Sequence, residues 1–417
     1  MPFGATLCIF RDEKVALHTL GCKLNYAETS TIGRQFAERG FEVVEFDQPA
    51  DVYLLNTCSV TERADRECRQ IIRRALRLSP EACIIVTGCY AQLRPEEISR
   101  IDGVDLVLGT KEKFSVFDHA DRFVKQPVPQ VYVSCIDDAS DCTPAFAADA
   151  GTRTRAFLKI QDGCDFNCAF CTIPLARGAS RSRPADDVVR DAGRIASEGF
   201  KEIVLPGANV GDYGAGSRGL IRLLRMLEHV GGIERIRISS IEPNLLTRGL
   251  VDFILGSEKY CNHFHIPLQS GSDEVLNRMR RRYTRDTYRA VVEYVREQDP
   301  DAAVGADVIV GFPGETDGLF RETSSFLSEL PVSYLHVFTF SERPGTPASD
   351  FGGRVEPRVR AGRSEALRLL GRKKKLAFCS SFVGRRMPVL FEGHHQGGVV
   401  SGLTGNYIRI EASSNGT

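Results

Sequence analysis

The stretch RAFLKIQDGCDFNCAFC, residues 155–171, predicts a short buried strand that runs directly into a loop with three cysteines. The loop places Cys164, Cys168 and Cys171 at the spacing C-x3-C-x2-C. Three thiolates this close can bind three corners of one four-iron, four-sulfur cluster and leave the fourth iron without a protein ligand. Such an open iron can bind a substrate or cofactor, whereas a cluster closed by four cysteines usually only carries electrons. The loop therefore predicts a reactive iron–sulfur centre.

This spacing is typical of enzymes that bind S-adenosyl-L-methionine (SAM) at the open iron and cleave it by one-electron reduction to a 5′-deoxyadenosyl radical. From residue 153 onward, short apolar runs alternate with helical patterns. The runs after the loop read EIVLPG, RIRISSIEP, HFHIPLQ, AAVGADVIVGFPG and SYLHVFTF. Six β/α units make about three-quarters of a TIM barrel, whose active residues lie at the carboxyl ends of the strands. We therefore expect a central partial TIM-type (β/α)6 barrel over residues 153–370.

The first 125 residues also alternate strands and helices, which predicts an N-terminal parallel sheet in an α/β fold. Cys22, Cys58 and Cys89 each follow one predicted strand: VALHTLG, DVYLLNT and ACIIVTG. The carboxyl ends of parallel strands meet at one edge of the sheet, where ligands bind. The alternative is three buried structural cysteines, because unpaired cysteine is often buried. A cysteine just after each of these three strands favours a second metal cluster over three structural cysteines.

The bulk composition excludes some classes of protein. The chain has 417 residues, and Lys+Arg and Asp+Glu are equal at 54 each, so there is no global basic field that points to nucleic acid. The 13 cysteines are spread over a chain far longer than a secreted disulfide scaffold. We see neither a signal peptide nor a membrane helix. A reducing, cytoplasmic setting without a membrane fits best.

Two further segments flank the predicted barrel. Residues 126–152 are rich in Pro, Asp, Ser and Ala, and we expect a linker there. Residues 371–417 contain short β-like runs separated by glycines, which predicts a small C-terminal β-barrel, short for a complete one.

Polar residues at or near the strand ends of the predicted barrel are candidates for SAM binding. Such a site needs carboxylates for the ribose and amino groups, an arginine for the carboxylate and backbone edges for adenine. Each residue alone could equally be a cap or a turn residue, but as a set on one face they favour a site. The candidates are Gly207, Asn209, Glu242, Gln269, Arg281 and Asp307.

Local basic patches are candidates for RNA contact, with a solvated helix face as the alternative. One patch is a stripe at helical spacing that begins beside Cys58 and contains Arg66, Arg69, Arg73 and Arg77. The other two are the runs 278–282 and 372–375.

Together, these motifs resemble the radical-SAM methylthiotransferases. The chain reads GCKLNYAETS around Cys22, NTCSVTERADRECRQ around Cys58 and FCTIPLARG from residue 170. These stretches are similar to the branch that acts on N6-threonylcarbamoyladenosine next to the anticodon of tRNA. The isopentenyladenosine branch usually reads GCQMN and CIVPYTRG, and the ribosomal-protein branch reads GCPKN.

The resemblance implies an α/β fold with an N-terminal methylthiotransferase domain, a radical-SAM barrel and a C-terminal TRAM-like β-barrel that binds RNA. It implies that Cys22, Cys58 and Cys89 hold an auxiliary 4Fe–4S cluster. It implies that the C-x3-C-x2-C loop holds the SAM cluster. The resemblance also implies that four of the candidates contact SAM: Glu242, Gln269, Arg281 and Asp307.

The implied reaction transfers a methylthio group to C2 of the adenine at tRNA position 37. One SAM methylates a sulfur held at the auxiliary cluster, and the radical from a second SAM removes the hydrogen from C2. The implied partners are the tRNA anticodon loop, a low-potential electron donor and a sulfur donor; no catalytic side chain is assigned. The alternatives are a methylthiotransferase of isopentenyladenosine or of a ribosomal-protein aspartate, and a non-enzymatic iron–sulfur protein that binds RNA.

Overall fold

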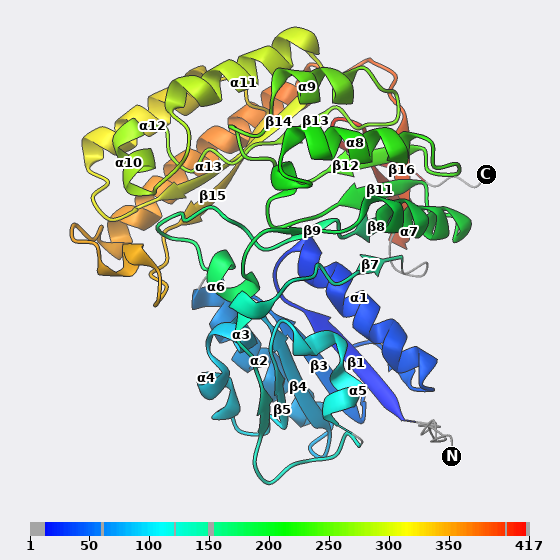
Figure 1. Ribbon diagram of the computed structural model, residues 1–417. Coiled ribbons are helices and arrows are strands. Elements are labelled where there is room, and N and C mark those ends of the chain that lie inside the picture. The colour runs from blue at the N-terminus through cyan, green and yellow to red at the C-terminus, as the bar shows by residue number, and fades with distance from the viewer. Residues whose placement is uncertain (1–12, 60–61, 121, 149–153, 397, 414–417) are drawn as a thin grey trace. The chain divides into compact units, whose positions relative to one another are not determined.

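The computed structural model describes residues 13–59, 62–120, 122–148, 154–396 and 398–413, which fall into two compact units (Figure 1). The first unit contains the described residues up to Ala147, together with Gly163–Asp165 and Thr172–Ala179. The second unit contains the rest of the chain. The domain limits expected from the sequence stay predictions, but two short pieces of the expected barrel segment pack with the first unit.

The first unit is built on a six-stranded parallel sheet in the order β2-β1-β3-β4-β5-β6. The two central strands are buried along their whole length, which explains their continuous apolar sequences. The strands are β1 (Lys14–Thr19), β2 (Glu42–Val44), β3 (Val52–Thr57), β4 (Cys83–Gly88), β5 (Leu106–Leu108) and β6 (Gln130–Tyr132). The expected parallel sheet is therefore confirmed.

Helices cover both faces of this sheet. On one face Ile32 and Phe36 of α1 pack on Val52 and Leu54 of β3, and on the other Ile72 of α2 packs on the alternate residues of the same strand. The helices are α1 (Lys23–Glu38), α2 (Glu62–Leu78), α3 (Cys89–Leu93), α4 (Pro95–Ser99), α5 (Val116–His119) and α6 (Ile173–Arg177). The unit also contains the 3-10 turns η1 (Glu112–Phe114) and η2 (Ile136–Asp138) and the short strand β7 (Phe146–Ala147).

The second unit contains six parallel strands that alternate with helices. Pairing joins β8, β11 and β12 into one sheet and β13, β14 and β15 into another, and a parallel bridge between Ile236 and Tyr260 links the two. The strands are β8 (Arg155–Leu158), β11 (Glu202–Leu205), β12 (Arg235–Ile238), β13 (His263–His265), β14 (Ala303–Val310) and β15 (Tyr334–Thr339). This arrangement confirms the partial barrel of six β/α units.

Helices follow the barrel strands in turn, and short elements decorate the loops. The helices are α7 (Ala185–Ser197), α8 (Ser217–Glu228), α9 (Arg248–Leu255), α10 (Asp273–Arg278), α11 (Arg285–Gln298) and α12 (Asp317–Glu329). The short elements are β9 (Gln161–Asp162), β10 (Arg181–Ser182), η3 (Val210–Asp212) and η4 (Pro347–Asp350). Within the described residues, no helix is long and apolar enough to cross a membrane.

The C-terminal region differs from the small barrel expected there. The long helix α13 (Pro357–Ser380) runs past residue 370, and an antiparallel sheet follows it. The sheet consists of β16 (Val389–Gln396), β17 (Val399–Thr404) and β18 (Arg409–Ser413). No closed barrel is found among the described residues of this region, because three short strands are too few to close a sheet on itself.

Candidate functional site

Three cysteines lie at one edge of the first unit's sheet. Cys22 follows β1 and directly precedes α1, Cys58 follows β3, and Cys89 follows β4 as the first residue of α3. The strands β1, β3 and β4 are neighbours in the sheet and run in the same direction. The fold therefore brings cysteines from three distant parts of the sequence to one edge of the sheet.

The loop after β1 packs tightly against Cys58. An ideal Cβ built on Gly21 would lie 2.7 Å from the Cβ of Cys58 and 3.0 Å from its Sγ, and Gly21 has φ +105°. Only glycine combines this backbone conformation with so close an approach. Soft thiol donors gathered around this close approach, in an α/β fold, fit the ligand set of an iron–sulfur cluster.

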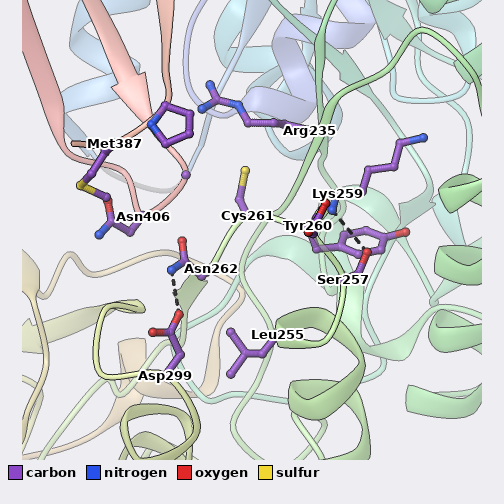
Figure 2. A pocket seen from close by; sticks show the side chains of 13 residues that line it. Arg235, Leu255, Ser257, Lys259, Tyr260, Cys261, Asn262, Asp299, Met387 and Asn406 are labelled. Carbon is purple, nitrogen blue, oxygen red and sulfur yellow. Dashed lines mark hydrogen bonds between the residues drawn. The ribbon is translucent and has the colours of Figure 1, made fainter. Parts of the chain in front are cut away.

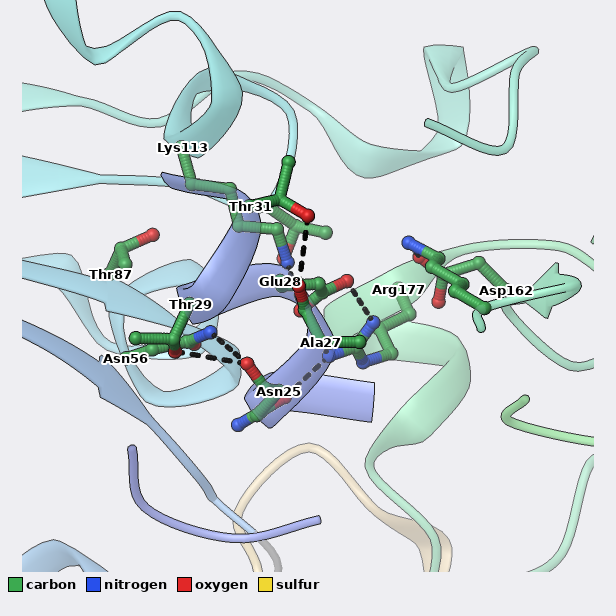
Figure 3. A network of polar contacts seen from close by, with 12 residues as sticks. Asn25, Ala27, Glu28, Thr29, Thr31, Asn56, Thr87, Lys113, Asp162 and Arg177 are labelled. Atoms are coloured by element: carbon green, nitrogen blue, oxygen red, sulfur yellow. Dashed lines mark hydrogen bonds and ion pairs between the residues drawn. The ribbon is translucent and has the colours of Figure 1, made fainter. Parts of the chain in front are cut away.

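Asn25 joins the loops that carry these cysteines. Its Nδ2 donates hydrogen bonds to the backbone oxygens of Leu20, at 2.9 Å, and of Thr57, at 3.0 Å. Its Oδ1 lies 3.8 Å from the Sγ of Cys22 and accepts a 2.6 Å hydrogen bond from Nη2 of Arg177 (Figure 3). One buried side chain therefore fixes the ends of two strands and the first thiol.

Arg177 belongs to a buried ionic network with Glu28 and Lys113 (Figure 3). Two guanidinium nitrogens of Arg177 each donate to the Glu28 carboxylate at 3.0 Å, and Nζ of Lys113 lies 2.7 Å from it. The three side chains are at most 1% exposed. Within this trio two cations share one carboxylate, and Arg177 also donates to Asn25 beside the first thiol.

The position of Arg177 links the two cysteine sets along the chain. Arg177 ends α6, which begins two residues after Cys171 and packs with the first unit, where Thr110 Oγ1 donates to the backbone oxygen of Ala176 at 2.8 Å. The pKa of the Cys22 thiol is raised mainly by desolvation, and Arg177 acts in the opposite direction. The segment after the C-x3-C-x2-C loop therefore influences the first thiol of the other set.

The C-x3-C-x2-C loop lies between β9 and α6. The backbone nitrogen of Cys164 donates to Gly178 O at 3.1 Å, and Cys164 groups with the first unit, whereas Cys168 and Cys171 group with the second. In the second unit, the fully buried Ala169 donates to Met279 O at 2.9 Å and accepts from Ala348 N at 2.8 Å. The part of the loop that carries Cys168 and Cys171 is thus fixed to the barrel by backbone hydrogen bonds.

Arg281 holds together the predicted SAM-binding residues nearest this loop. Its Nη1 donates to the Sγ of Cys168 at 3.0 Å, its Nε donates to the Tyr283 hydroxyl at 3.0 Å, and its Nη2 contacts the Glu242 carboxylate. Burial raises the pKa of the Cys168 thiol, and Arg281 acts in the opposite direction. Burial also raises the pKa of Glu242, against the effect of Arg281, and nearby Asp307 adds to the rise. A thiol, a guanidinium and a carboxylate therefore meet at one point.

Gly207 and Asn209 lie just beyond β11 and pack on Gln161. A Cβ on Gly207 would lie 2.9 Å from Gln161 Oε1, which accepts a 2.8 Å hydrogen bond from the Asn209 backbone. The Asn209 side chain is 3% exposed, and neither of its polar atoms has a hydrogen-bond partner among the described residues. A buried unpaired amide is costly, so its presence favours a bound ligand.

Gln269 lies beyond the end of β13, where it forms a parallel bridge with Val308 of β14, next to Asp307. Gln269 has φ +68°, an uncommon conformation for a residue other than glycine, and its backbone nitrogen donates to Asp307 O at 2.8 Å. The side chain of Asp307 instead faces His265 and His336. Burial alone would raise the pKa of Asp307, but hydrogen bonds from these two imidazoles outweigh it and leave the pKa below its usual range.

Part of the predicted arginine stripe lines a cleft in the first unit. The cleft of about 690 Å³ lies between α2 and the region of α4 and contains four arginines and two carboxylates. Arg69, Arg73 and Arg77 of the stripe line it together with Arg100, whereas Arg66 is not part of the lining.

A second cavity, of about 350 Å³, lies in the second unit (Figure 2). Its lining includes Cys261 and Asn262, which precede β13, and Asn406 of the tail. Catalytic groups of β/α barrels lie at the carboxyl ends of the strands. This cavity lies at the amino-terminal end of β13, so we do not assign it to the reaction.

Sequence reasoning did not identify several residues of these networks. Asn25, Glu28 and Arg177 stand inside the quoted motifs GCKLNYAETS and FCTIPLARG, but nothing in their spacing shows that they meet. His265 and His336 lie on predicted strands, and only the register of those strands brings them to Asp307.

Comparison with known proteins agrees with this architecture. A family model described as "Uncharacterized protein family UPF0004" matches residues 14–109, and one described as "Radical SAM superfamily" matches residues 158–327. The solved structure of the radical S-adenosylmethionine methyltransferase TsrM from Kitasatospora setae, with cobalamin and a 4Fe-4S cluster bound, is similar at a TM-score of 0.56. It covers 81% of this chain and 77% of that chain at 16% identity, a likeness of fold alone.

Two relatives are similar along most of the chain. Threonylcarbamoyladenosine tRNA methylthiotransferase MtaB of Bacillus subtilis (strain 168) is 42% identical over 95% of this chain and 89% of its own length. The tRNA-2-methylthio-N(6)-dimethylallyladenosine synthase of Syntrophus aciditrophicus (strain SB) is 33% identical over 92% of this chain and 84% of its own. Both the N-terminal sheet and the barrel are therefore shared, and the chain belongs to the radical-SAM methylthiotransferase family.

Proposed function

We propose that this methylthiotransferase acts on tRNA and adds a methylthio group to C2 of N6-threonylcarbamoyladenosine at position 37. The observation that carries the proposal is the edge of the first sheet, where a cysteine follows each of three adjacent parallel strands, in the same chain as the C-x3-C-x2-C loop. The substrate is supported by the higher identity to the threonylcarbamoyladenosine enzyme than to the dimethylallyladenosine enzyme.

Two 4Fe–4S clusters would be held, one by each cysteine set. The SAM cluster would use Cys164, Cys168 and Cys171, and the auxiliary cluster would use Cys22, Cys58 and Cys89. When bound, the first supplies the electron that cleaves SAM, and the second supplies an iron to which the transferred sulfur can bind. C2 of adenine carries no acidic proton, so acid–base catalysis by side chains cannot activate it.

The residues of the chain bind and orient the cofactor. Arg281 can pair with the carboxylate of SAM while it contacts Cys168 and Glu242, and Glu242 can accept from the SAM amino group. Asn209 offers a buried amide whose hydrogen bonds are unfilled among the described residues, and Gly207 allows the chain to approach Gln161 closely. Gln269 completes the proposed set.

Asp307 contributes to SAM binding through its backbone in this proposal. Its carbonyl oxygen holds the backbone nitrogen of Gln269, whereas its carboxylate is engaged by His265 and His336.

The proposed macromolecular partner is the anticodon loop of tRNA. The arginines of the cleft in the first unit supply positive charge for phosphates, although the chain as a whole has no net charge. The reaction also requires a low-potential electron donor and a sulfur donor, and we propose that it takes place in the cytoplasm, where tRNA is modified.

Nucleoside mass spectrometry tests the proposal. A strain without this gene is expected to lose the 2-methylthio form of threonylcarbamoyladenosine and to regain it with the wild-type gene, but not with Cys168→Ala. In vitro, the anaerobically reconstituted protein should methylthiolate a tRNA that carries threonylcarbamoyladenosine. If the deletion strain instead lost only 2-methylthio-isopentenyladenosine, the assigned substrate would be wrong.

A further inference from the structure

We propose that His265, Asp307 and His336 form a binding site for a divalent cation in the barrel, and that the open coordination positions of this cation bind the carboxylate of the threonylcarbamoyl group. The second half of this inference rests on the proposed substrate, whereas the cation site itself does not.

The three side chains come from three adjacent strands. Asp307 on β14 pairs in register with His336 on β15, and His265 at the end of β13 pairs with Gly305, two residues before Asp307. Side chains alternate along a strand, so positions 305 and 307 face the same side of the sheet. His265 and Asp307 therefore face the same side of the sheet, and their side chains are in hydrogen-bond contact.

The distances fit a shared ligand. Nε2 of His265 lies 2.8 Å and Nδ1 of His336 lies 3.3 Å from Oδ1 of Asp307, and the three ligand atoms all lie within 4.8 Å of one another. Around a cation with bonds of about 2.1 Å, neighbouring ligands are roughly 3.0–3.4 Å apart. The two distances to Asp307 are close to this range, and the two imidazole nitrogens, which lie within 4.8 Å of each other, have to move closer for one ion to contact all three atoms.

A hydrogen bond already orients one of the two imidazoles. The Oγ of Ser240 lies 2.7 Å from Nδ1 of His265, which directs Nε2 of the same ring toward Asp307. Histidines that bind metals almost always hydrogen bond through their other ring nitrogen in this way.

The site has room for an ion to arrive and for a further ligand. The side chain of His336 is 50% exposed, whereas those of His265 and Asp307 are 18% and 19% exposed. Two imidazoles and one carboxylate leave open positions on metals such as Mn²⁺, Fe²⁺ or Zn²⁺. With both imidazoles neutral, a divalent ion on this set keeps one positive charge, which favours an anionic fourth ligand.

The proposed substrate carries such a ligand. The threonylcarbamoyl group offers a carboxylate, a hydroxyl and a urea oxygen, all of them hard donors that suit these ions. An isopentenyl group is a hydrocarbon and offers none. A cation at this site would therefore discriminate between the two modified adenosines by their side chains.

Manganese binding tests the cation site directly. Mn²⁺ prefers oxygen and imidazole ligands to thiolates, so it can be titrated into the cluster-loaded protein and followed by loss of the free-ion EPR signal. We expect one Mn²⁺ per chain, and an increase of about tenfold or more in Kd for His336→Ala and for Asp307→Asn. His229→Ala is the matched control, because His229 is exposed at the C-terminal end of α8 and outside the site.

Equal Mn²⁺ binding by wild type and both site variants, or no binding at all, would overturn the cation site.

A second experiment tests substrate recognition. It compares the binding of an anticodon stem-loop that carries threonylcarbamoyladenosine with that of the same stem-loop carrying adenosine. Mn²⁺ should strengthen binding of the first about tenfold more than that of the second, and in His336→Ala this difference should vanish.

The two arms separate the two claims. An equal effect of Mn²⁺ on both stem-loops would overturn the role of the cation in substrate recognition. Formation of 2-methylthio-threonylcarbamoyladenosine by a protein that binds no Mn²⁺ would refute the inference and leave the proposed function standing. Mn²⁺ binding by a protein that modifies a different nucleoside would confirm the site and refute the substrate.

Discussion

Replacement of Gly21 by alanine is expected to prevent assembly of the cluster on the first thiol edge. The new Cβ would lie 2.7 Å from the Cβ of Cys58, whereas carbon atoms in contact are about 3.5–4.0 Å apart, so Cys58 has to retreat by about 1 Å. Metal–thiolate sites tolerate errors of only about 0.2 Å in bonds of about 2.3 Å. The shift is therefore about five times larger than a cluster ligand can absorb.

Gly216→Ala provides a control for backbone strain. Gly216 has φ +106°, against +105° at Gly21, but apart from its immediate chain neighbours no described residue has an atom within 4 Å of its Cβ position. Both variants therefore carry a backbone cost of about 1–3 kcal/mol, and only Gly21→Ala adds the collision with Cys58.

The assay counts iron and sulfide after anaerobic reconstitution in a background that isolates the auxiliary cluster. In that background the three cysteines of the C-x3-C-x2-C loop are replaced by alanine. About four irons per chain are expected for Gly216→Ala and close to none for Gly21→Ala. If Gly21→Ala retained as much iron as Gly216→Ala, Cys58 would not be a ligand or the loop would give way, and the reasoning would fail.

Three further changes have expected outcomes. Arg177→Met breaks the buried pair with Glu28 and should destabilise the cluster-free protein by about 3–5 kcal/mol in urea unfolding, with partial recovery when Glu28→Gln is added. Asn209→Leu removes a buried unpaired amide, so the melting temperature should not fall while the Kd for SAM rises about tenfold in equilibrium dialysis. A hydrogen bond from Arg360 lowers the pKa of Glu342 in the folded protein. The pair therefore stabilises the fold at pH values above about 4.3, the pKa of glutamate in the unfolded chain. This stabilisation is lost as the pH falls through the lower pKa that Glu342 has in the folded protein. The decline in urea midpoint of the cluster-free protein below about pH 4.3 should be shallower in Glu342→Gln.

The buried trio of Arg177, Glu28 and Lys113 suggests how the two cysteine sets are coupled through the covalent chain. Arg177 lies six residues after Cys171 and contacts Asn25, which lies three residues after Cys22. Buried ion pairs contribute little net stability compared with apolar residues of the same volume, whereas removal of one partner is strongly destabilising.

Much of the fold could be predicted because the burial of a strand or helix produces a periodic pattern of apolar residues in the sequence. The continuous apolar runs at β3 and β4 and the alternation of strands and helices gave both α/β units and the six barrel strands. The tail was harder, because its three short strands carry the same glycine-separated pattern whether or not the sheet closes. The packing of Thr172–Ala179 with the first unit could not be predicted from the apolar pattern, because it depends on contacts with residues far away in sequence.

The sequence by itself determined the chemistry that depends on local spacing. Cys164, Cys168 and Cys171 lie within eight residues, so chain geometry alone keeps their thiols within reach of one cluster. The ends of parallel strands likewise follow from pattern and put Cys22, Cys58 and Cys89 on one edge.

Only the tertiary structure decided which polar side chains meet. Arg177 and Glu28 are 149 residues apart, and His265 and Asp307 are 42 apart, so their contacts depend on packing and strand register rather than on spacing. Local periodicity reports which face of an element is buried, but not which distant partner covers it. For that reason the sequence predicts the two thiol sets, whereas the hydrogen bonds that position them and the His–Asp–His cluster are visible only in the folded chain.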